Sequence, residues 1–109
     1  MKKALALASA ILIAAPAWAA PMDAKTVRLF LTACVKQADA CNTALSERVT
    51  AEADADPGKD VCITDDMRDA PIMISRAMMR YLKETKGLAA QPLIKVLDAG
   101  AKILYPCNP

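Results

Sequence analysis

Apolar residues recur at intervals of three and four along most of this chain, the period of an amphipathic helix. The first such run begins at Asp23, and its apolar face carries Val27, Phe30, Leu31, Cys34 and Ala38. A second run extends to about Ala53, with an apolar face formed by Cys41, Leu45 and Val49. The polar stretch from Asp54 to Asp60, which contains Pro57 and Gly58, then predicts an exposed turn.

The second half of the chain predicts two more helices. Asp69 is placed to cap the first of them, Pro71 falls in its first turn, and Gly87 follows as a left-handed stop. Its apolar face comprises Ile74, Met78, Tyr81 and Leu82, widened by Ile72, Ala77 and Met79. The last helix starts at Pro92 and ends before Pro106, with an apolar face of Leu93, Ile94, Leu97, Ala101 and Leu104. Since no segment alternates as a strand does, we expect an all-α fold.

The N-terminal residues have the pattern of a secretory signal peptide. Lys2 and Lys3 precede the apolar stretch 4–15, and the small-x-small sequence Ala17-Trp18-Ala19 follows it. A membrane anchor is the alternative, but the apolar run is broken by Pro16 and is shorter than the ~20 residues of a span. We predict that residues 1–19 are removed, that residues 20–109 form a single domain, and that this domain makes no membrane contact after cleavage.

Charge excludes some partners and suggests others. The chain has 14 Lys and Arg and 12 Asp and Glu, so removal of Lys2 and Lys3 leaves a domain of zero net charge. Without a basic excess, we expect no nucleic-acid binding. The charges are unevenly distributed, because residues 20–75 carry a net charge of −4 and residues 76–109 a net charge of +4. They form either two solvated faces or a polarised surface that steers a partner or pairs two protomers.

The residues of common active sites are missing. The chain has no His, which removes the commonest general base and metal ligand. Ser46 and Ser75 lie in no nucleophile motif, and the glycines form no phosphate-binding loop. We therefore expect neither an enzyme nor a bound cofactor. The methionines at 22, 67, 73, 78 and 79 suggest either a copper(I) site or core packing, and their helical spacing favours core packing over any metal.

Four cysteines, Cys34, Cys41, Cys62 and Cys107, predict two disulfides in an exported domain of this size. A zinc site is the alternative, but no Cys-x-x-Cys pair is present. Spacing alone does not choose among the three possible pairings. In a continuous helix the Cα atoms of Cys34 and Cys41 would lie about 10.5 Å apart, beyond the ~7 Å limit of a disulfide. That pair therefore needs a chain reversal within residues 37–40, with Asp39 or Asn42 capping the next helix.

Brief connections between helices favour antiparallel neighbours. We thus expect a small disulfide-stapled bundle of about four antiparallel helices. In this arrangement the end of the first helix meets the start of the second, and the end of the fourth returns to the start of the third. The favoured pairs are therefore Cys34–Cys41 and Cys62–Cys107.

The sequence around the second cysteine pair resembles a known family. Val61-Cys62-Ile63 precedes a helix that ends in Tyr81-Leu82-Lys83, and the next helix closes with Leu104-Tyr105-Pro106-Cys107. This pattern resembles the Rap/Tai family of small, exported, all-helical immunity proteins associated with type VI secretion amidase effectors. The resemblance is greatest over Cys62–Cys107. It is looser over Cys34–Ala53, where Asn42-Thr43-Ala44 replaces the Gly-Tyr of a common Cys-x-Gly-Tyr motif.

The resemblance implies a periplasmic inhibitor that occludes the active-site cleft of a secreted peptidoglycan amidase, often as a homodimer. The alternative from another class is a small acid-stress periplasmic chaperone, in which protonation of 12 carboxylates opens the fold. A structural subunit of the cell envelope is a third interpretation.

The polar turn is the candidate partner-binding site. Asp54, Asp56 and Asp60 lie on the longest polar connection, where flanking helices hold a projecting loop. Three like charges on a turn are more commonly just solvated. If the turn binds nothing, the basic face around Arg76, Arg80 and Lys83 is the next candidate.

Overall fold

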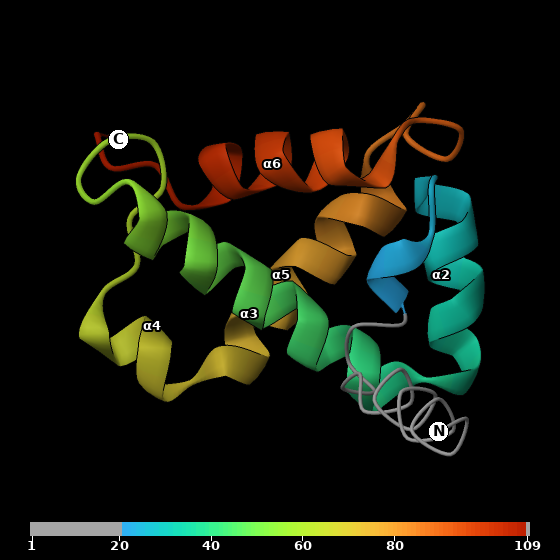
Figure 1. Cartoon of the computed structure of the whole chain (residues 1–109), viewed down its shortest axis with the longest axis horizontal. Helices are drawn as coiled ribbons and strands as arrows, with labels where there is room; N and C mark the ends of the chain where they lie inside the picture. Colours follow the sequence, from blue (N-terminus) through green and yellow to red (C-terminus); the bar gives the residue numbers. More distant parts are fainter. Residues whose placement is uncertain (1–20, 109) are drawn as a thin grey trace, which may run out of the picture.

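The computed structural model describes residues 21–108, and its helices are labelled as in Figure 1. They are α2 (Val27–Lys36), α3 (Ala38–Ala55), α4 (Asp65–Asp69), α5 (Pro71–Glu84) and α6 (Leu93–Leu104). Within these residues there is no strand, only two isolated β-bridges, Thr26 to Pro92 and Val61 to Pro106. The all-α prediction is confirmed. The expected signal peptide, residues 1–19, lies outside the described residues.

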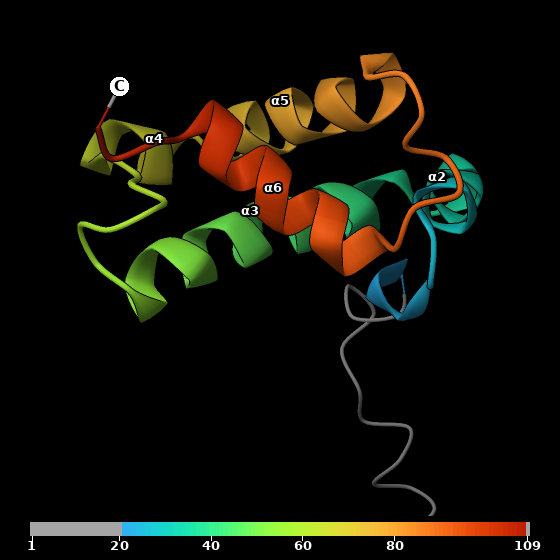
Figure 2. The ribbon, with the colours of Figure 1, turned by 90° about the horizontal axis from the view of Figure 1, so that it is seen from above.

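The helices are stacked rather than arranged as a simple four-helix bundle. α3 and α5 cross and share the most extensive packing, and α6 lies over both (Figures 1 and 2). Along the long axis α5 runs opposite to α3 and to α6, as predicted for antiparallel neighbours (Figure 1). α2 instead stands across one end of this stack, and the short α4 is an element that the sequence pattern did not predict.

Backbone hydrogen bonds hold α2 in this crosswise position. The amides of Val27 and Arg28 donate to the carbonyls of Gln91 and Ala89, at 3.1 and 2.9 Å. The amide of Leu93 returns a bond of 2.9 Å to the carbonyl of Lys25. The start of α2 is therefore tied to the connection that enters α6.

Helix ends differ from the sequence prediction at several points. Thr26 and Thr64 cap α2 and α4, each hydroxyl accepting a backbone N–H, at 3.3 and 3.2 Å. The predicted caps are wrong: Asp69 is the last residue of α4, and Asp39 and Asn42 lie inside α3. Ala70 and Gln37 occupy those N-cap positions without a side-chain bond. Gly87 does adopt the expected left-handed conformation, with φ of +82°.

The core lies between α2, α3, α5 and α6 and follows the predicted apolar faces closely. Its largest fully buried side chains are Phe30, Leu45, Ile74, Met78, Leu93 and Leu97. Three predicted core positions are wrong, because Ala38, Ile72 and Ile94 are exposed. Val96 and Gly100 are buried instead. At Gly100 a Cβ would lie 2.7 Å from the ring of Tyr81, so the missing side chain lets α6 approach α5.

The methionines differ in their surroundings. Met78 is buried in the core, and Met22, Met67 and Met79 pack against it, as expected for core filling. Met73 is 57% exposed.

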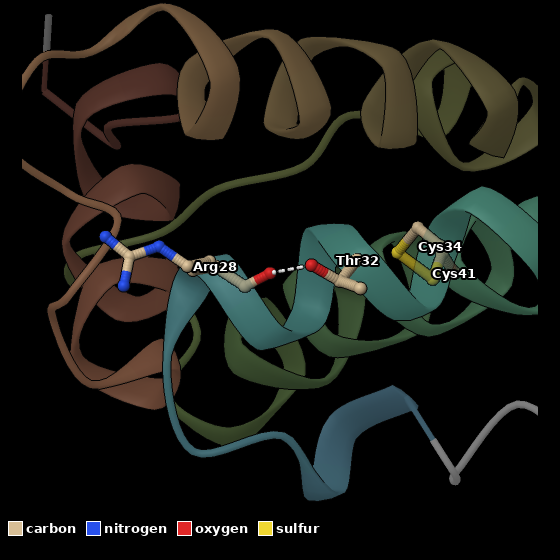
Figure 3. The surroundings of a disulfide bond; sticks show 4 residues. All are labelled: Arg28, Thr32, Cys34 and Cys41. Atoms are coloured by element: carbon tan, nitrogen blue, oxygen red, sulfur yellow. Dashed lines mark hydrogen bonds between the residues drawn. A yellow bond between two sulfur atoms is a disulfide. The ribbon is translucent and has the colours of Figure 1, made fainter.

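Both predicted disulfides are present. Cys34–Cys41 joins the end of α2 to the first turn of α3, with a Cα–Cα distance of 5.6 Å (Figure 3). The chain reversal that it requires occurs at a single residue, Gln37. Cys62–Cys107 joins the segment before α4 to the segment after α6, with a Cα–Cα distance of 4.8 Å. Two such bonds are typical of proteins that fold in an oxidising compartment.

Candidate partner-binding surface

The predicted acidic turn lies at one end of the molecule, beside the segment that follows α6 (Figure 1). Asp54 belongs to the last turn of α3, and Asp56 and Asp60 lie in the loop that follows. All three are exposed. The structure therefore gathers the three candidate residues on one projecting segment.

The base of this turn is firmly attached to the fold. Val61 is only 4% exposed and forms the isolated bridge with Pro106. The amide of Cys62 donates to the carbonyl of Tyr105 at 2.9 Å, next to the Cys62–Cys107 disulfide. Within the turn the amide of Lys59 donates to the carbonyl of Asp56 at 3.3 Å, across a Gly58 whose φ is +78°. The loop is short and is held at the point where it rejoins the core.

Asp54 differs from the other two aspartates because it has a partner within the chain. Its carboxylate accepts two hydrogen bonds from the Arg68 guanidinium, at 2.6 and 3.5 Å. The hydrogen bond from Arg68 to Asp54 raises the pKa of Arg68 above its ordinary value. This pair links the end of α3 to α4, so Asp54 orders the turn and is less available to a partner than Asp56 and Asp60.

The helix α4 adds three carboxylates that were not among the candidate residues: Asp65, Asp66 and Asp69. With them, residues 54–69 carry six acidic and two basic residues, and we call this segment the acidic end. Thr64 followed by two aspartates is a helix-start signal that could have revealed α4. A hollow of about 210 Å³ lies at the base of the acidic end, lined in part by Pro57, Val61, Ile63 and Arg68.

A hollow of about 420 Å³ lies elsewhere, along α3 beside Ile94 of α6. Its lining is mostly apolar, and its charged residues are Glu47, Arg48 and Glu52. Arg48 Nε forms an ion pair with Glu52 Oε2 at 3.2 Å, although neither atom has a hydrogen-bond partner in the described part of the chain. On α6, Asp98 pairs with Lys102 at 3.9 Å.

Glu52 is a partly buried carboxyl on α3. The pKa of Glu52 is raised from 4.5 to about 7. Burial is the largest cause, followed by a hydrogen bond to Asp98 and by the negative charge of Asp98. The positive charges of Arg48 and Lys102 oppose this shift. The folded state therefore binds a proton at Glu52 more tightly than the unfolded state does.

The tighter binding of a proton at Glu52 in the folded state predicts that the stability of the protein depends on pH. Because the pKa of Glu52 is higher in the folded state, its contribution is fully present below pH 4.5 and is lost as pH rises through about 7. We expect Glu52→Gln to abolish that loss and to raise the free energy of unfolding at pH 8 by about 1–2 kcal/mol, after allowance for solvent screening. Urea unfolding of the wild type and of the variant at pH 5 and pH 8 measures this difference in the free energy of unfolding. Glu47→Gln, an exposed carboxylate on the same hollow, is the control, and equal gains from both variants would contradict the prediction.

All four cysteines are in disulfides, and no group of three or more Cys, Asp or Glu side chains within residues 21–108 could hold a metal ion. None of the helices in this part of the chain is long and apolar enough to cross a membrane.

Comparison of the chain with protein-family models, with curated proteins and with solved structures gives no match.

Proposed function

We propose that this protein is an exported inhibitor of the immunity-protein type, which binds a secreted peptidoglycan amidase and blocks its active-site cleft without catalysing a reaction. The proposal starts from the resemblance of Cys62–Cys107 to the Rap/Tai family. The observation that carries it is the acidic end: a short, exposed, negatively charged projection held by a disulfide at its base and by the Asp54–Arg68 pair.

Rigidity matters for this kind of inhibitor. Binding orders side chains and loops, and a segment already held in its bound conformation avoids much of that cost. Within the acidic end, the turn of residues 54–60 is attached through Val61 and Cys62 on one side and through α3 on the other. Its charge also suits a cleft with basic groups, since complementary potentials speed the encounter and disfavour other partners.

The place of action follows from the same proposal. Cleavage after Ala19 would release residues 20–109 into the periplasm, where both disulfides form. Intact-mass measurement of protein recovered from the periplasm is expected to show a chain starting at Ala20 with no alkylatable thiol. Retention of residues 1–19, or alkylation of any of the four cysteines, would contradict export with oxidation.

Changing Asp54, Asp56 and Asp60 together to Ala tests the binding surface. The partner for this test is an amidase whose gene neighbours the gene of this protein. At low ionic strength we expect the triple variant to associate with it about tenfold more slowly than the wild type, and its association rate to depend less on salt. The thermal midpoint should hardly change, because the Asp54–Arg68 pair is exposed and such pairs contribute little to stability. Surface plasmon resonance at several salt concentrations, together with thermal unfolding, measures both effects.

The control variant replaces Asp23, Glu47 and Glu84 by Ala, which changes the net charge equally but leaves the acidic end intact. It is expected to associate at close to the wild-type rate. If both triple variants bind as the wild type does, the amidase contacts another surface. If the unmodified protein leaves hydrolysis of purified peptidoglycan by that amidase unaffected, the inhibitor proposal itself is wrong.

The acid-stress chaperone is less well supported. Opening by acid requires the folded state to lose stability as carboxylates take up protons. Glu52 acts in the opposite direction, because its protonation between pH 7 and 4.5 favours the folded state. We therefore favour the inhibitor over the chaperone.

A further inference from the structure

A second surface, distinct from the turn of residues 54–60, lies where α3 crosses α5. One hollow of about 250 Å³ lies between the α2–α3 corner and α5, lined in part by Leu31, Val35 and Met79. Another of about 190 Å³ lies between α3 and the start of α5, lined in part by Ser46, Ile72 and Ser75. Asn42 lines both hollows, so they are neighbours along one groove, which we call the α3–α5 groove.

The groove has exposed apolar side chains at both ends. Val35 is 82% exposed and Ile72 is 43% exposed, although both are large aliphatic residues. Ile72 and Met79 are seven residues apart on α5 and therefore share one face of that helix. The opposite flank of α5, with Ala77 and Tyr81, faces Leu104 of α6. The face of α5 that carries Ile72 and Met79 is thus a second apolar face, separate from the one that packs against α6.

Positive charge follows the same face. Arg76 and Lys83 lie four and eleven residues after Ile72, on the same face of α5, and Lys83 lines the first hollow. Arg80 instead lines the hollow on the opposite flank of α5, with Ala77 and Tyr81. Arg76 and Lys83 are exposed, and neither forms an ion pair with a residue of the described chain. None of the residues that line the two hollows carries a carboxylate. The groove therefore combines apolar hollows with an unpaired basic rim.

We propose that the α3–α5 groove binds an acidic amphipathic segment of a partner protein, with apolar side chains in the two hollows and carboxylates against Arg76 and Lys83. Helices that place an apolar face into a groove between two helices are a common recognition mode, and complementary charges at the rim set partner choice. This proposal does not rest on the amidase, because Asp54, Asp56 and Asp60 line neither hollow. The turn that follows α3 lies at the other end of the molecule from the α2–α3 corner (Figure 1).

The test is an NMR titration of the full domain with a defined probe. The probe is a synthetic helical peptide made of glutamate and leucine, in which the leucines are spaced alternately three and four residues apart. A peptide with lysine in place of each glutamate is its matched control. We expect saturable shifts of the backbone amides of Val35, Asn42, Ile72 and Met79 with the glutamate peptide alone. Shifts located on the acidic end, or equal binding of the lysine peptide, would overturn the proposal.

Variants separate the charged and apolar contributions. Arg76→Glu with Lys83→Glu is expected to weaken binding of the glutamate peptide by about tenfold or more and to reduce its salt dependence. Val35→Ser with Ile72→Ser is expected to weaken it with the salt dependence preserved. Because all four side chains are exposed, thermal midpoints should stay close to wild type, which separates lost binding from lost folding.

Arg28→Glu with Lys95→Glu is the control, since it changes the net charge equally at exposed cations outside the groove. A loss of binding in this control equal to that of the groove variant would identify non-specific attraction and overturn the proposal. Shifts of the groove amides that depend on protein concentration without peptide would show that a second copy of the chain occupies the groove, which would also overturn it.

Discussion

Replacement of Cys62 and Cys107 by serine is expected to lower the free energy of unfolding by about 4 kcal/mol. The bond closes a loop of 45 residues in sequence separation, so its loss restores much conformational freedom to the unfolded chain. Loss of this bond also detaches the segment before α4 from the segment after α6. In a domain whose total stability is of the order of 5–15 kcal/mol, this is a large fraction.

The Cys34–Cys41 pair provides the internal comparison. Its sequence separation is only 7, and its replacement by serines is expected to cost about 2.5 kcal/mol. Urea unfolding of the two double variants, at matched temperature and pH, gives both values. Equal losses would contradict the loop-length argument and would indicate that native-state contacts around the cysteines dominate.

Replacement of Phe30 by Ala is expected to cost about 3–5 kcal/mol. The Phe30 side chain is fully buried in the core, and its ring is the largest side chain there. Removal of the ring loses the stabilisation that comes from burying its apolar surface. It also leaves a cavity, which the surrounding helices can fill only in part because they are attached at their ends. The crosswise α2 is anchored by this residue, by Val27 and by the Cys34–Cys41 bond.

Leu29 is the matched control on the same helix. It precedes Phe30 and is 53% exposed, so Leu29→Ala is expected to change stability by no more than about 0.5 kcal/mol. Thermal and urea unfolding measure both variants. A small effect at Phe30, or equal effects at the two positions, would show that α2 contributes little to the cooperative core.

The helices of the second half were predictable because their signals are local. The apolar period of α5 and α6, Pro71 in the first turn and Gly87 after the helix each act within a few residues. The disulfide pairing was also predictable, because short connections limit which helix ends meet. The first helix break was harder to predict, since Gln37, the single residue between α2 and α3, is neither Gly nor Pro.

The candidate site was predicted in part. Composition located Asp54, Asp56 and Asp60, but not the three aspartates of α4 that join them or the Arg68 that binds Asp54. Arg68 is 14 residues from Asp54 in sequence, and no periodic pattern links positions across a loop. The same limit applies to the α3–α5 groove, whose residues come from three helices.

The sequence by itself determined the helical class, the apolar faces, the cysteine pairs and the acidic character of the turn, because each depends on local period, spacing or composition. Only the tertiary structure decided which edges of those faces are covered. Ile72 and Ile94 have the helical spacing of core residues, yet they are exposed because α2 stands across the stack and no fifth long helix covers them within residues 21–108. Likewise, burial beside Asp98 of α6 raises the pKa of Glu52 on α3, although the two residues are distant in sequence. Burial and charge proximity are properties of the packed chain, and a helical period specifies a face without specifying its neighbour.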